Sequence, residues 1–334
     1  MIIERLRFKE VSTNPHLGHN APFKIALRAQ WEINEQKQHT GDKFAIHKAL
    51  QELQLQAQGN YMTETSDHAS EQIADNIRLH EKIARSYDQR HAEIYNAIEQ
   101  QRLSESLANA TGQIKSGGLR SMDYGCGAGN LTHHLIRLGH TVTAADVTPS
   151  FTQITSSFDP ARITPFVLNG ADMHEVESGS FDLIATYSVL HHIPDYITAI
   201  KEMIRVTKSG GIIYLDHEAS PEHWNPSPAL SEFRSKTIVR NSIGHYALCL
   251  LSPKWWMKRA RKTWNPRYAE EGDIHVWPDD HIEWDAIRTL FTTEGVEILR
   301  DESYLLFQPH YDVNLWQEYR DRCTDMHIIV GRKR

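Results

Sequence analysis

The sequence has few cysteines and no long apolar run. Only three of its 334 residues are cysteine, and Cys126, Cys249 and Cys323 stand far apart in the chain. Three such thiols suit a reducing compartment better than a disulfide framework. No apolar stretch approaches the roughly 18 residues that a transmembrane helix needs, and no repeat or low-complexity block is present. The composition therefore excludes integral-membrane, collagen-like and disordered proteins.

Positive charge is not in excess either. The chain carries 36 Lys and Arg against 43 Asp and Glu, a formal net charge of −7. A surface that coats nucleic acid is basic, so we expect no nucleic-acid partner unless a local basic patch supplies one. The first ten residues, MIIERLRFKE, are charged where a secretory signal is apolar, which predicts a cytoplasmic protein.

The pattern of residue types along the chain changes near residue 115. Residues 22–111 are rich in helix-forming residues and contain only Gly41 and Gly59 as breaks. Five isoleucines, one tyrosine and one leucine recur at near-helical spacing over residues 73–103, which predicts an amphipathic helix there. We interpret residues 1–114 as a helical N-terminal extension.

Residues 115–334 alternate short apolar segments with helical ones, the pattern of a parallel α/β sheet. The predicted strands end at Asp123 and span 140–146, 163–168, 181–188 and 212–215, with helices at 130–138 and 195–207. After a proline- and tryptophan-rich insertion at 219–280, a helix at 281–294, an extended segment at 296–307 and a strand at 326–330 complete the sheet as an antiparallel edge hairpin. The expected fold class is α/β, a doubly wound Rossmann-like sheet, with the insertion as a lid or substrate-binding segment.

The strongest chemical signal is the glycine loop after the first predicted strand. Residues 123–130 read DYGCGAGN, so their glycines follow G-x-G-x-G and not the G-x-G-x-x-G of a nicotinamide-binding loop. Glycines at a helix N-terminus allow a tight turn and close approach of a ligand to the backbone. The carboxylate of Asp123 would repel a pyrophosphate and attract an ammonium group. A ligand that carries an ammonium and an adenosine therefore fits better than a dinucleotide.

These residues resemble the class I S-adenosylmethionine-dependent methyltransferases, whose sheet has seven strands. The resemblance is strong over 115–218 and looser over 281–334. It implies S-adenosyl-L-methionine as the cofactor and S-adenosyl-L-homocysteine as the product. The cofactor-binding residues that it implies are Tyr87, Asp123, Gly125, Cys126, Gly127, Gly129, Asp146, Val147, Asp172, Met173 and Ser188.

The resemblance also assigns a part of the cofactor to each segment. The glycine loop would hold the methionine portion, and Asp146 would accept hydrogen bonds from both ribose hydroxyls. Asp172 would bind the adenine amino group, with Met173 against the ring. Ser188 belongs to a segment that lines the methyl-transfer site in this family, and Tyr87 belongs to a helix that closes over the cofactor.

Methyl transfer from a sulfonium is an in-line displacement that needs alignment and exclusion of water more than a covalent residue. A hydroxyl acceptor also benefits from a general base, and His191, His192 and His217 follow the fourth and fifth predicted strands, with His192 and His217 favoured. Residues 216–218 read DHE and could bind a metal with these histidines, but the spacing is not that of a tight ligand set, so we predict no metal.

The insertion at 219–280 contains most of the remaining residues that suggest a binding surface. Residues 254–262 carry five positive charges, and tryptophans flank them on a different helical face. Residues 238–264 could thus form an amphipathic surface that contacts a membrane or binds a lipophilic or anionic acceptor, or a lid whose tryptophans pack on the sheet. The density of imidazoles and indoles further on leads us to expect His275 and Trp277 beside the acceptor.

The predicted function is methyl transfer to a small-molecule acceptor. An interaction protein that keeps the methyltransferase fold but is catalytically idle, and a nucleotide-dependent oxidoreductase, are the alternatives. The sequence does not distinguish oxygen, nitrogen and carbon acceptors, and it leaves the oligomeric state open, a homodimer included.

Overall fold

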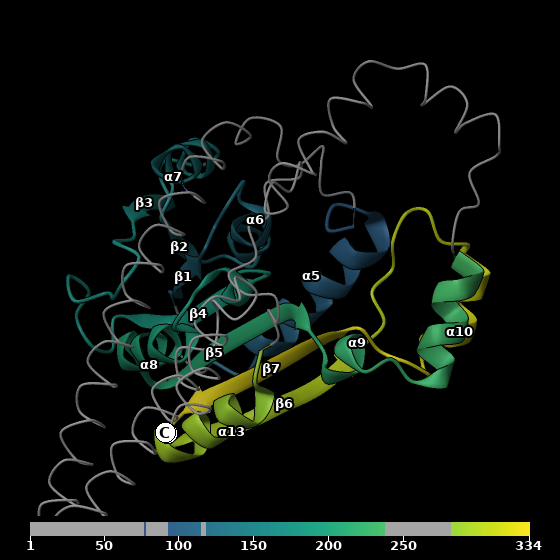
Figure 1. Cartoon of the computed structure of the whole chain (residues 1–334). Coiled ribbons are helices and arrows are strands. Elements are labelled where there is room, and N and C mark those ends of the chain that lie inside the picture. Colours follow the sequence, from purple (N-terminus) through teal and green to yellow (C-terminus); the bar gives the residue numbers. More distant parts are fainter. Residues whose placement is uncertain (1–76, 78–92, 115–117, 238–281) are drawn as a thin grey trace, which may run out of the picture. The chain divides into compact units, whose positions relative to one another are not determined.

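The computed structural model describes residues 77, 93–114, 118–237 and 282–334 (Figure 1). The helices predicted before residue 93, and the part of the insertion that holds the basic cluster, lie outside these residues. The described residues form the sheet, its flanking helices and the start of the insertion.

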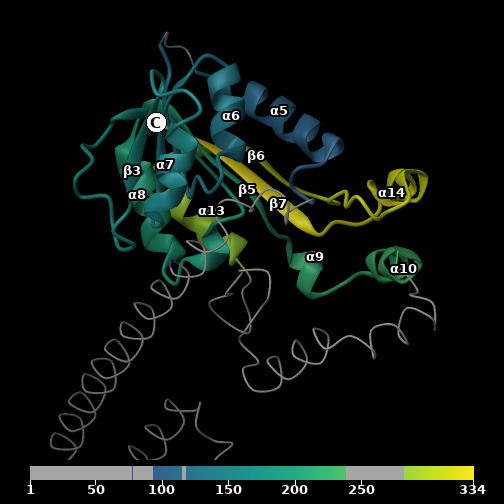
Figure 2. The same cartoon turned by 90° about the horizontal axis from the view of Figure 1, so that it is seen from above.

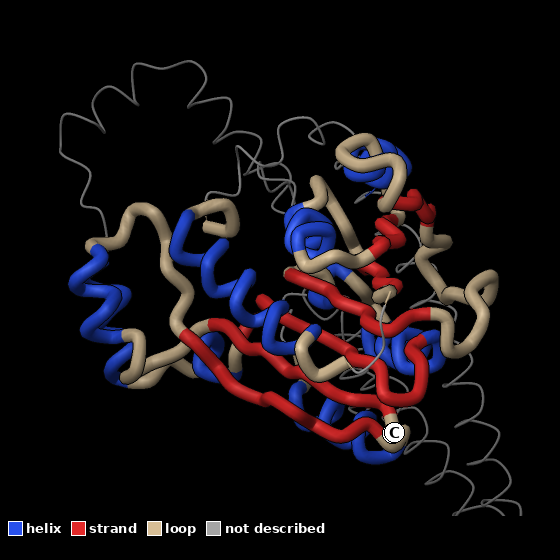
Figure 3. The backbone as a smooth tube through the Cα atoms, turned by 180° about the vertical axis from the view of Figure 1, so that it is seen from behind, coloured by secondary structure: helices blue, strands red, loops and turns tan. Residues whose placement is uncertain are grey.

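Seven strands form one sheet in the order β3-β2-β1-β4-β5-β7-β6 (Figures 1 and 3). Their bounds are β1 Arg120–Tyr124, β2 Thr141–Asp146, β3 Ile163–Val167, β4 Phe181–Tyr187, β5 Thr207–Ala219, β6 Val296–Tyr304 and β7 Met326–Lys333. The pairs among β1 to β5 are parallel, and β7 runs antiparallel between β5 and β6. The predicted doubly wound sheet with an antiparallel edge hairpin is confirmed.

The described helices flank this sheet. They are α5 Ala97–Thr111, α6 Asn130–Arg137, α7 Pro149–Ser156, α8 Tyr196–Val206, α9 Pro221–Trp224, α10 Pro228–Thr237, α13 Trp284–Thr293 and α14 Val313–Tyr319, with a 3₁₀ turn, η3, at Leu190–His192. The helices expected at 130–138, 195–207 and 281–294 are present with shifts of at most three residues at an end. Helices α7, α9, α10 and α14 were not predicted, because they are short and lack a long apolar period.

Alternate residues of the same strands supply two separate cores, as side chains on a pleated strand must. One core packs Ile184 and Ile213 under α8 and α13, and the other packs Leu183 and Ile212 under α5 and α6. Strand β4 is therefore buried along its whole length, which explains its almost continuous apolar sequence. Figure 2 shows α5 and α6 on one side of the sheet and α8 and α13 on the other.

Two predicted boundaries were wrong. The helix expected near 73–103 is not continuous in its described part, because residues 93–96 form turns and α5 begins at Ala97. The Asn96 side chain caps this start by accepting from the Glu99 amide, a stronger local signal than the isoleucine spacing. Strand β5 begins five residues before the predicted Ile212, because Thr207 already pairs with Phe181 of β4.

Polar residues in β1 are buried with partners. Ser121 hydrogen-bonds the ring of His140, and Asp123 accepts from the hydroxyl of Thr132 at 2.5 Å. Both residues are almost fully buried. Burial of paired polar groups is tolerated, so a strand more polar than usual still lies at the centre of the sheet.

The start of the insertion joins a small lobe at one end of the sheet. Helices α10 and α14 lie side by side there (Figure 2), and their apolar residues include Phe233, Trp316 and Tyr319. None of the helices in the described ranges is both long and apolar enough to cross a bilayer.

Candidate active site

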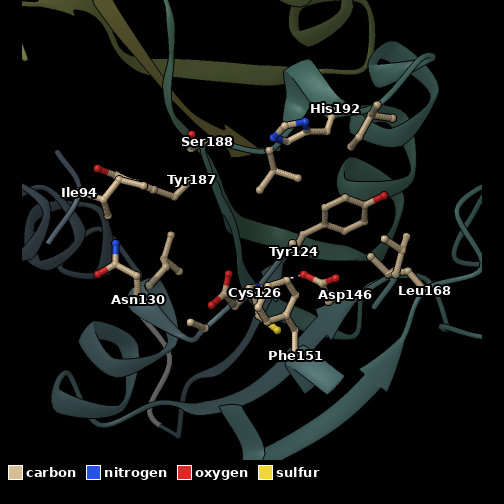
Figure 4. Close-up of a pocket in the computed structure, with 18 of the residues that line it drawn as sticks. Ile94, Tyr124, Cys126, Asn130, Asp146, Phe151, Leu168, Tyr187, Ser188 and His192 are labelled. Atoms are coloured by element: carbon tan, nitrogen blue, oxygen red, sulfur yellow. Dashed lines mark hydrogen bonds between the residues drawn. The ribbon is translucent and has the colours of Figure 1, made fainter. Parts of the chain in front are cut away.

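A pocket opens at the carboxyl ends of β1, β2 and β4, where ligands of doubly wound sheets bind. Its lining includes Ile94, Tyr95, Asp123, Tyr124, Gly125, Cys126, Gly127, Ala128, Asn130, Leu131, Asp146, Val147, Phe151, Leu168, Gly170, Tyr187, Ser188, Val189, His192, Ile193 and Pro194. Figure 4 shows Ile94, Asn130 and Tyr187 at one end of the pocket and Asp146 and Leu168 at the other. Most of the cofactor-binding residues expected from the sequence come together here.

The glycine loop requires its glycines. Gly125, Gly127 and Gly129 all have positive φ, at 76°, 46° and 88°. At Gly125 a Cβ would lie 2.5 Å from a methyl group of Val189, which is closer than atoms can approach. Gly129 is the N-cap of α6, and no side chain caps this helix start. The loop therefore presents bare backbone to the pocket, which suits a ligand that lies close to it.

Asp146 holds this loop in place from the end of β2. Its Oδ2 accepts from the Gly127 amide at 3.0 Å, and its Oδ1 accepts from the Thr148 amide at 2.8 Å. The Thr155 hydroxyl in turn donates to the Gly127 carbonyl at 2.9 Å. These bonds hold the carboxylate in one fixed orientation at the pocket lining.

Asp123 is the second acidic residue of the pocket and is almost fully buried. Burial, opposed by hydrogen bonds from Thr132 and assisted by the charge of Asp146, raises the pKa of Asp123 to about 7. A nearby cation would favour its ionised form. Burial also raises the pKa of the Cys126 thiol well above its usual value, so Cys126 contributes shape and not a thiolate nucleophile.

Glu218 fixes the loop that follows β4. Its Oε1 accepts from the amides of Val189 and Leu190 at 2.8 and 2.7 Å, and its Oε2 lies 2.7 Å from His191 Nδ1. The rings of His191 and His192 are in contact, with centroids 4.0 Å apart. Of the three histidines expected as a base, His192 is the one that lines the pocket.

His217 lies outside the pocket lining. Its ring stacks on Tyr187 at a centroid distance of 4.5 Å, and its Nδ1 lies 3.3 Å from the Tyr304 hydroxyl and 3.6 Å from Glu99 Oε1. It is 5% exposed and is not among the pocket residues. The structure therefore does not bring this predicted base to the pocket, because a bulge in β5 with positive φ at His217 turns it into a buried network.

That buried network was not predicted from the sequence. Arg102 of α5 bonds Glu99 at 2.6 Å and Asp216 at 2.9 Å, and the Tyr187 hydroxyl donates to Glu99 at 2.7 Å. Burial alone raises a carboxyl pKa, but the interactions of Glu99 with His217 and Arg102 outweigh it and lower the pKa of Glu99 to about 2. The network attaches α5 to the wall of the pocket that Tyr187 forms.

The segment after β3 differs from expectation. The Asp172 carboxylate is exposed and bonds His174 at 2.6 Å and Asn169 at 2.9 Å, and these hydrogen bonds lower the pKa of Asp172 to about 2. Met173 is 2% exposed and belongs to the core below. Neither residue lines the pocket, since the Asn169 side chain accepts from the amides of residues 171 and 172 and holds the turn outward. Leu168 and Gly170 line it instead.

Three expected site residues, Tyr87, His275 and Trp277, lie outside the described residues. The sequence reading missed Gln100, which bonds Asn130 from α5, and it did not assign Asn130 a role. The sequence position of Asn130 could have indicated a role in the site, because Asn130 follows the glycine loop directly and begins the next helix. Within the described ranges, no group of three or more His, Cys, Asp or Glu side chains is arranged to hold a metal ion.

Comparison with known proteins agrees with this geometry. Residues 122–215 match a family model described as a methyltransferase domain. Over 112 residues the chain is 30% identical to the ubiquinone biosynthesis O-methyltransferase of Xanthomonas oryzae pv. oryzae, which is 33% of this chain and 47% of that protein. A counterpart from Xanthomonas campestris pv. campestris is 32% identical over 101 residues, 29% of this chain and 42% of its own. The chain thus spans about half the length of the curated relatives it matches.

Similar solved structures cover more of the chain at lower identity. The YcgJ protein from Bacillus subtilis covers 70% of this chain and 99% of its own, with a TM-score of 0.43 and 16% identity. A S-adenosylmethionine-dependent methyltransferase from Methanosarcina mazei covers 67% and 96%, with a TM-score of 0.42 and 17% identity.

The matched segment contains the glycine loop, Asp146 and the strand that leads to the His192 loop. The segment therefore resembles a methyltransferase domain, and this likeness implies S-adenosylmethionine as the cofactor.

The contact between Gly125 and Val189 yields a test. Gly125→Ala adds a Cβ that must displace one loop, which we expect to lower the free energy of unfolding by about 1–3 kcal/mol and to abolish binding of S-adenosylhomocysteine in isothermal titration calorimetry. Gly139→Ala is the matched control, because Gly139 has a similar φ of 87° but no atom within 4 Å of the added Cβ. Equal binding by both variants would contradict the role of this contact.

Proposed function

We propose that the protein transfers the methyl group of S-adenosylmethionine to a hydroxyl of a small lipophilic acceptor by in-line displacement. The observation that carries the proposal is one pocket that combines the bare glycine loop, the fixed carboxylate of Asp146 and the His192 loop. The cofactor supplies a methyl group made electrophilic by its sulfonium.

The residues of the pocket fit this cofactor. The Asp146 carboxylate lines the pocket where the ribose hydroxyls would lie, and the apolar side chains of Leu168 and Phe151 line the part where the adenine ring would lie. Burial raises the pKa of Asp123, and an ammonium group beside it would favour the ionised form. At Gly127 a Cβ would meet no atom of the described chain within 4 Å, so the backbone there is open to the ligand.

The proposal of a lipophilic acceptor depends on the residues of the other wall of the pocket. Ile94, Val189, Ile193 and Pro194 give it an apolar lining, which favours a lipophilic molecule. A hydroxyl acceptor is favoured because the curated relatives are named for O-methyl transfer in ubiquinone biosynthesis. We keep His275 and Trp277 as proposed acceptor contacts from the insertion.

We propose His192 as the general base that takes the proton of the acceptor hydroxyl. Its ring lines the pocket, while His191 bonds Glu218 and His217 lies in the buried network. Glu218 fixes the backbone of residues 189 and 190 and, through the contact between the two imidazoles, supports the position of His192. Glu218 and His191 are positioning residues in this account.

Cofactor binding tests the proposed function. S-adenosylhomocysteine should raise the melting temperature of the protein and NAD should not, because a ligand that binds only the folded state stabilises it. Asp146→Ala should remove the shift. Incubation with methyl-labelled cofactor and a cell extract should then label a small organic-soluble product. A shift with NAD alone, or label confined to protein or nucleic acid, would contradict the proposal.

His192→Ala tests the base once the labelled acceptor is known. We expect kcat to fall by about 10²- to 10⁴-fold, with the Kd of S-adenosylhomocysteine unchanged, because a base acts on the acceptor and not on the cofactor. Increasing the pH should restore part of the rate as the acceptor hydroxyl ionises. The exposed His310→Ala is the control. A His192→Ala enzyme with a wild-type rate would eliminate His192 as the base.

A further inference from the structure

Two adjacent strands end in the same unusual backbone conformation. Tyr187 of β4 and Asp216 of β5 are register partners, and each is followed by a residue with positive φ, Ser188 at 59° and His217 at 65°. Apart from glycines, no other residue in the described ranges has positive φ. A side chain makes this left-handed conformation unfavourable, so it persists only where the surroundings enforce it, and such residues cluster at functional sites.

The two left-handed residues shape one wall of the pocket. Ser188 lines the pocket on the side that also carries His192 (Figure 4). The positive φ at His217 is part of the bulge in β5, and the next residue, Glu218, accepts from the amides of residues 189–190. The backbone that leads from β4 to His192 therefore depends on both conformations.

Asp216 holds the backbone of both left-handed residues. Its carbonyl accepts from the Ser188 amide at 3.0 Å, and its Oδ1 accepts from the His217 amide at 2.7 Å. The carboxylate is fully buried, and Tyr214 and Arg102 donate to its Oδ2 at 2.6 and 2.9 Å. One residue thus fixes the chain on two strands, and its own position depends on these donors.

Helix α5 supplies the groups that keep Asp216 in place. Arg102 bonds both Asp216 and Glu99, and Glu99 accepts from the Tyr187 hydroxyl at 2.7 Å. Ser188 follows Tyr187 directly, and Asp216 holds its amide, so the bonds close a ring at one peptide link. A closed ring of this kind opposes relaxation of Ser188 to negative φ.

We propose that Glu99 and Arg102 are positioning residues for methyl transfer and act by holding Ser188 in its left-handed conformation. Neither side chain lines the pocket, so both act through Tyr187 and Asp216, which they contact. The effect on transfer rests on the proposed function, whereas the effect on the backbone at Ser188 does not depend on a ligand.

Glycine at residue 188 separates this role from a purely structural one. Tyr187→Phe removes the hydroxyl that donates to Glu99 and keeps the ring that stacks on His217. Glu99→Gln removes the charge beside Arg102. Each change is made with Ser188 and again with Ser188→Gly, because glycine adopts positive φ without strain. Ser188→Ala is the matched control, since it also removes the hydroxyl of residue 188 but still disfavours positive φ.

The first measurement is hydrogen exchange at the amides of Val189 and Leu190 in the full chain without ligand, because exchange reports local opening of this wall. With Ser188 in place, Tyr187→Phe and Glu99→Gln should speed this exchange by about tenfold, within the range for one lost hydrogen bond. Ser188→Gly should reduce the increase to about twofold, since opening then releases no strain. Ser188→Ala should leave the increase as it is.

The second measurement is the rate at which labelled methyl reaches the organic-soluble product at saturating S-adenosylmethionine. Tyr187→Phe and Glu99→Gln should lower this rate by about 10- to 100-fold, because a small misplacement of the reacting groups costs that much. Ser188→Gly should restore part of the rate, and Ser188→Ala should not. Tyr319→Phe, which loses a bond from Lys236 outside the pocket lining, should change neither measurement.

Wild-type exchange and transfer in Tyr187→Phe and Glu99→Gln would overturn the proposal. Defects that persist equally with Ser188→Gly and Ser188→Ala would also overturn it, because they would indicate a structural role only. If the wild-type protein labels no organic-soluble product while Ser188→Gly still suppresses the exchange defect, the proposed function fails and the enforced conformation of Ser188 is supported.

Discussion

The pocket depends on one close approach, the packing of Val189 against Gly125. A side chain at residue 125 has no room there, so the loops after β1 and β4 lock together only with glycine at this position. Glu218 holds Val189 from β5 through its amide, and Asp146 holds Gly127 from β2. Four strand ends are thereby connected through two short loops, and the geometry of the pocket follows from the geometry of the sheet.

Helix α5 completes this arrangement from the other side. Its Glu99 and Arg102 are buried against the hydroxyl of Tyr187 and the carboxylate of Asp216, and its Gln100 bonds Asn130. Because a buried charge without its partner is strongly destabilising, the helix cannot shift without breaking the network. Residues 94–111 therefore support the pocket wall, with Ile94 and Tyr95 among its lining residues.

Local chemistry made most of the fold and the cofactor loop predictable. Strand β4 is apolar because both of its faces are covered, and the glycines of the loop reflect positive φ angles that the structure has. The exceptions depend on tertiary context. The buried network needs residues more than 80 positions apart, such as Glu99 and Tyr187. The outward turn of Asp172 depends on the Asn169 side chain, and the bulge at His217 has no marker in one sequence.

A crystal structure of the protein with S-adenosylhomocysteine tests the central claim most directly. This account predicts the ribose on Asp146, the adenine toward Leu168 and the homocysteine portion between Asp123 and Asn130. Its sulfur should face the His192 loop. Density for the ligand in another part of the molecule, or in this pocket with the adenine against Asn130 and the homocysteine toward Leu168, would contradict it.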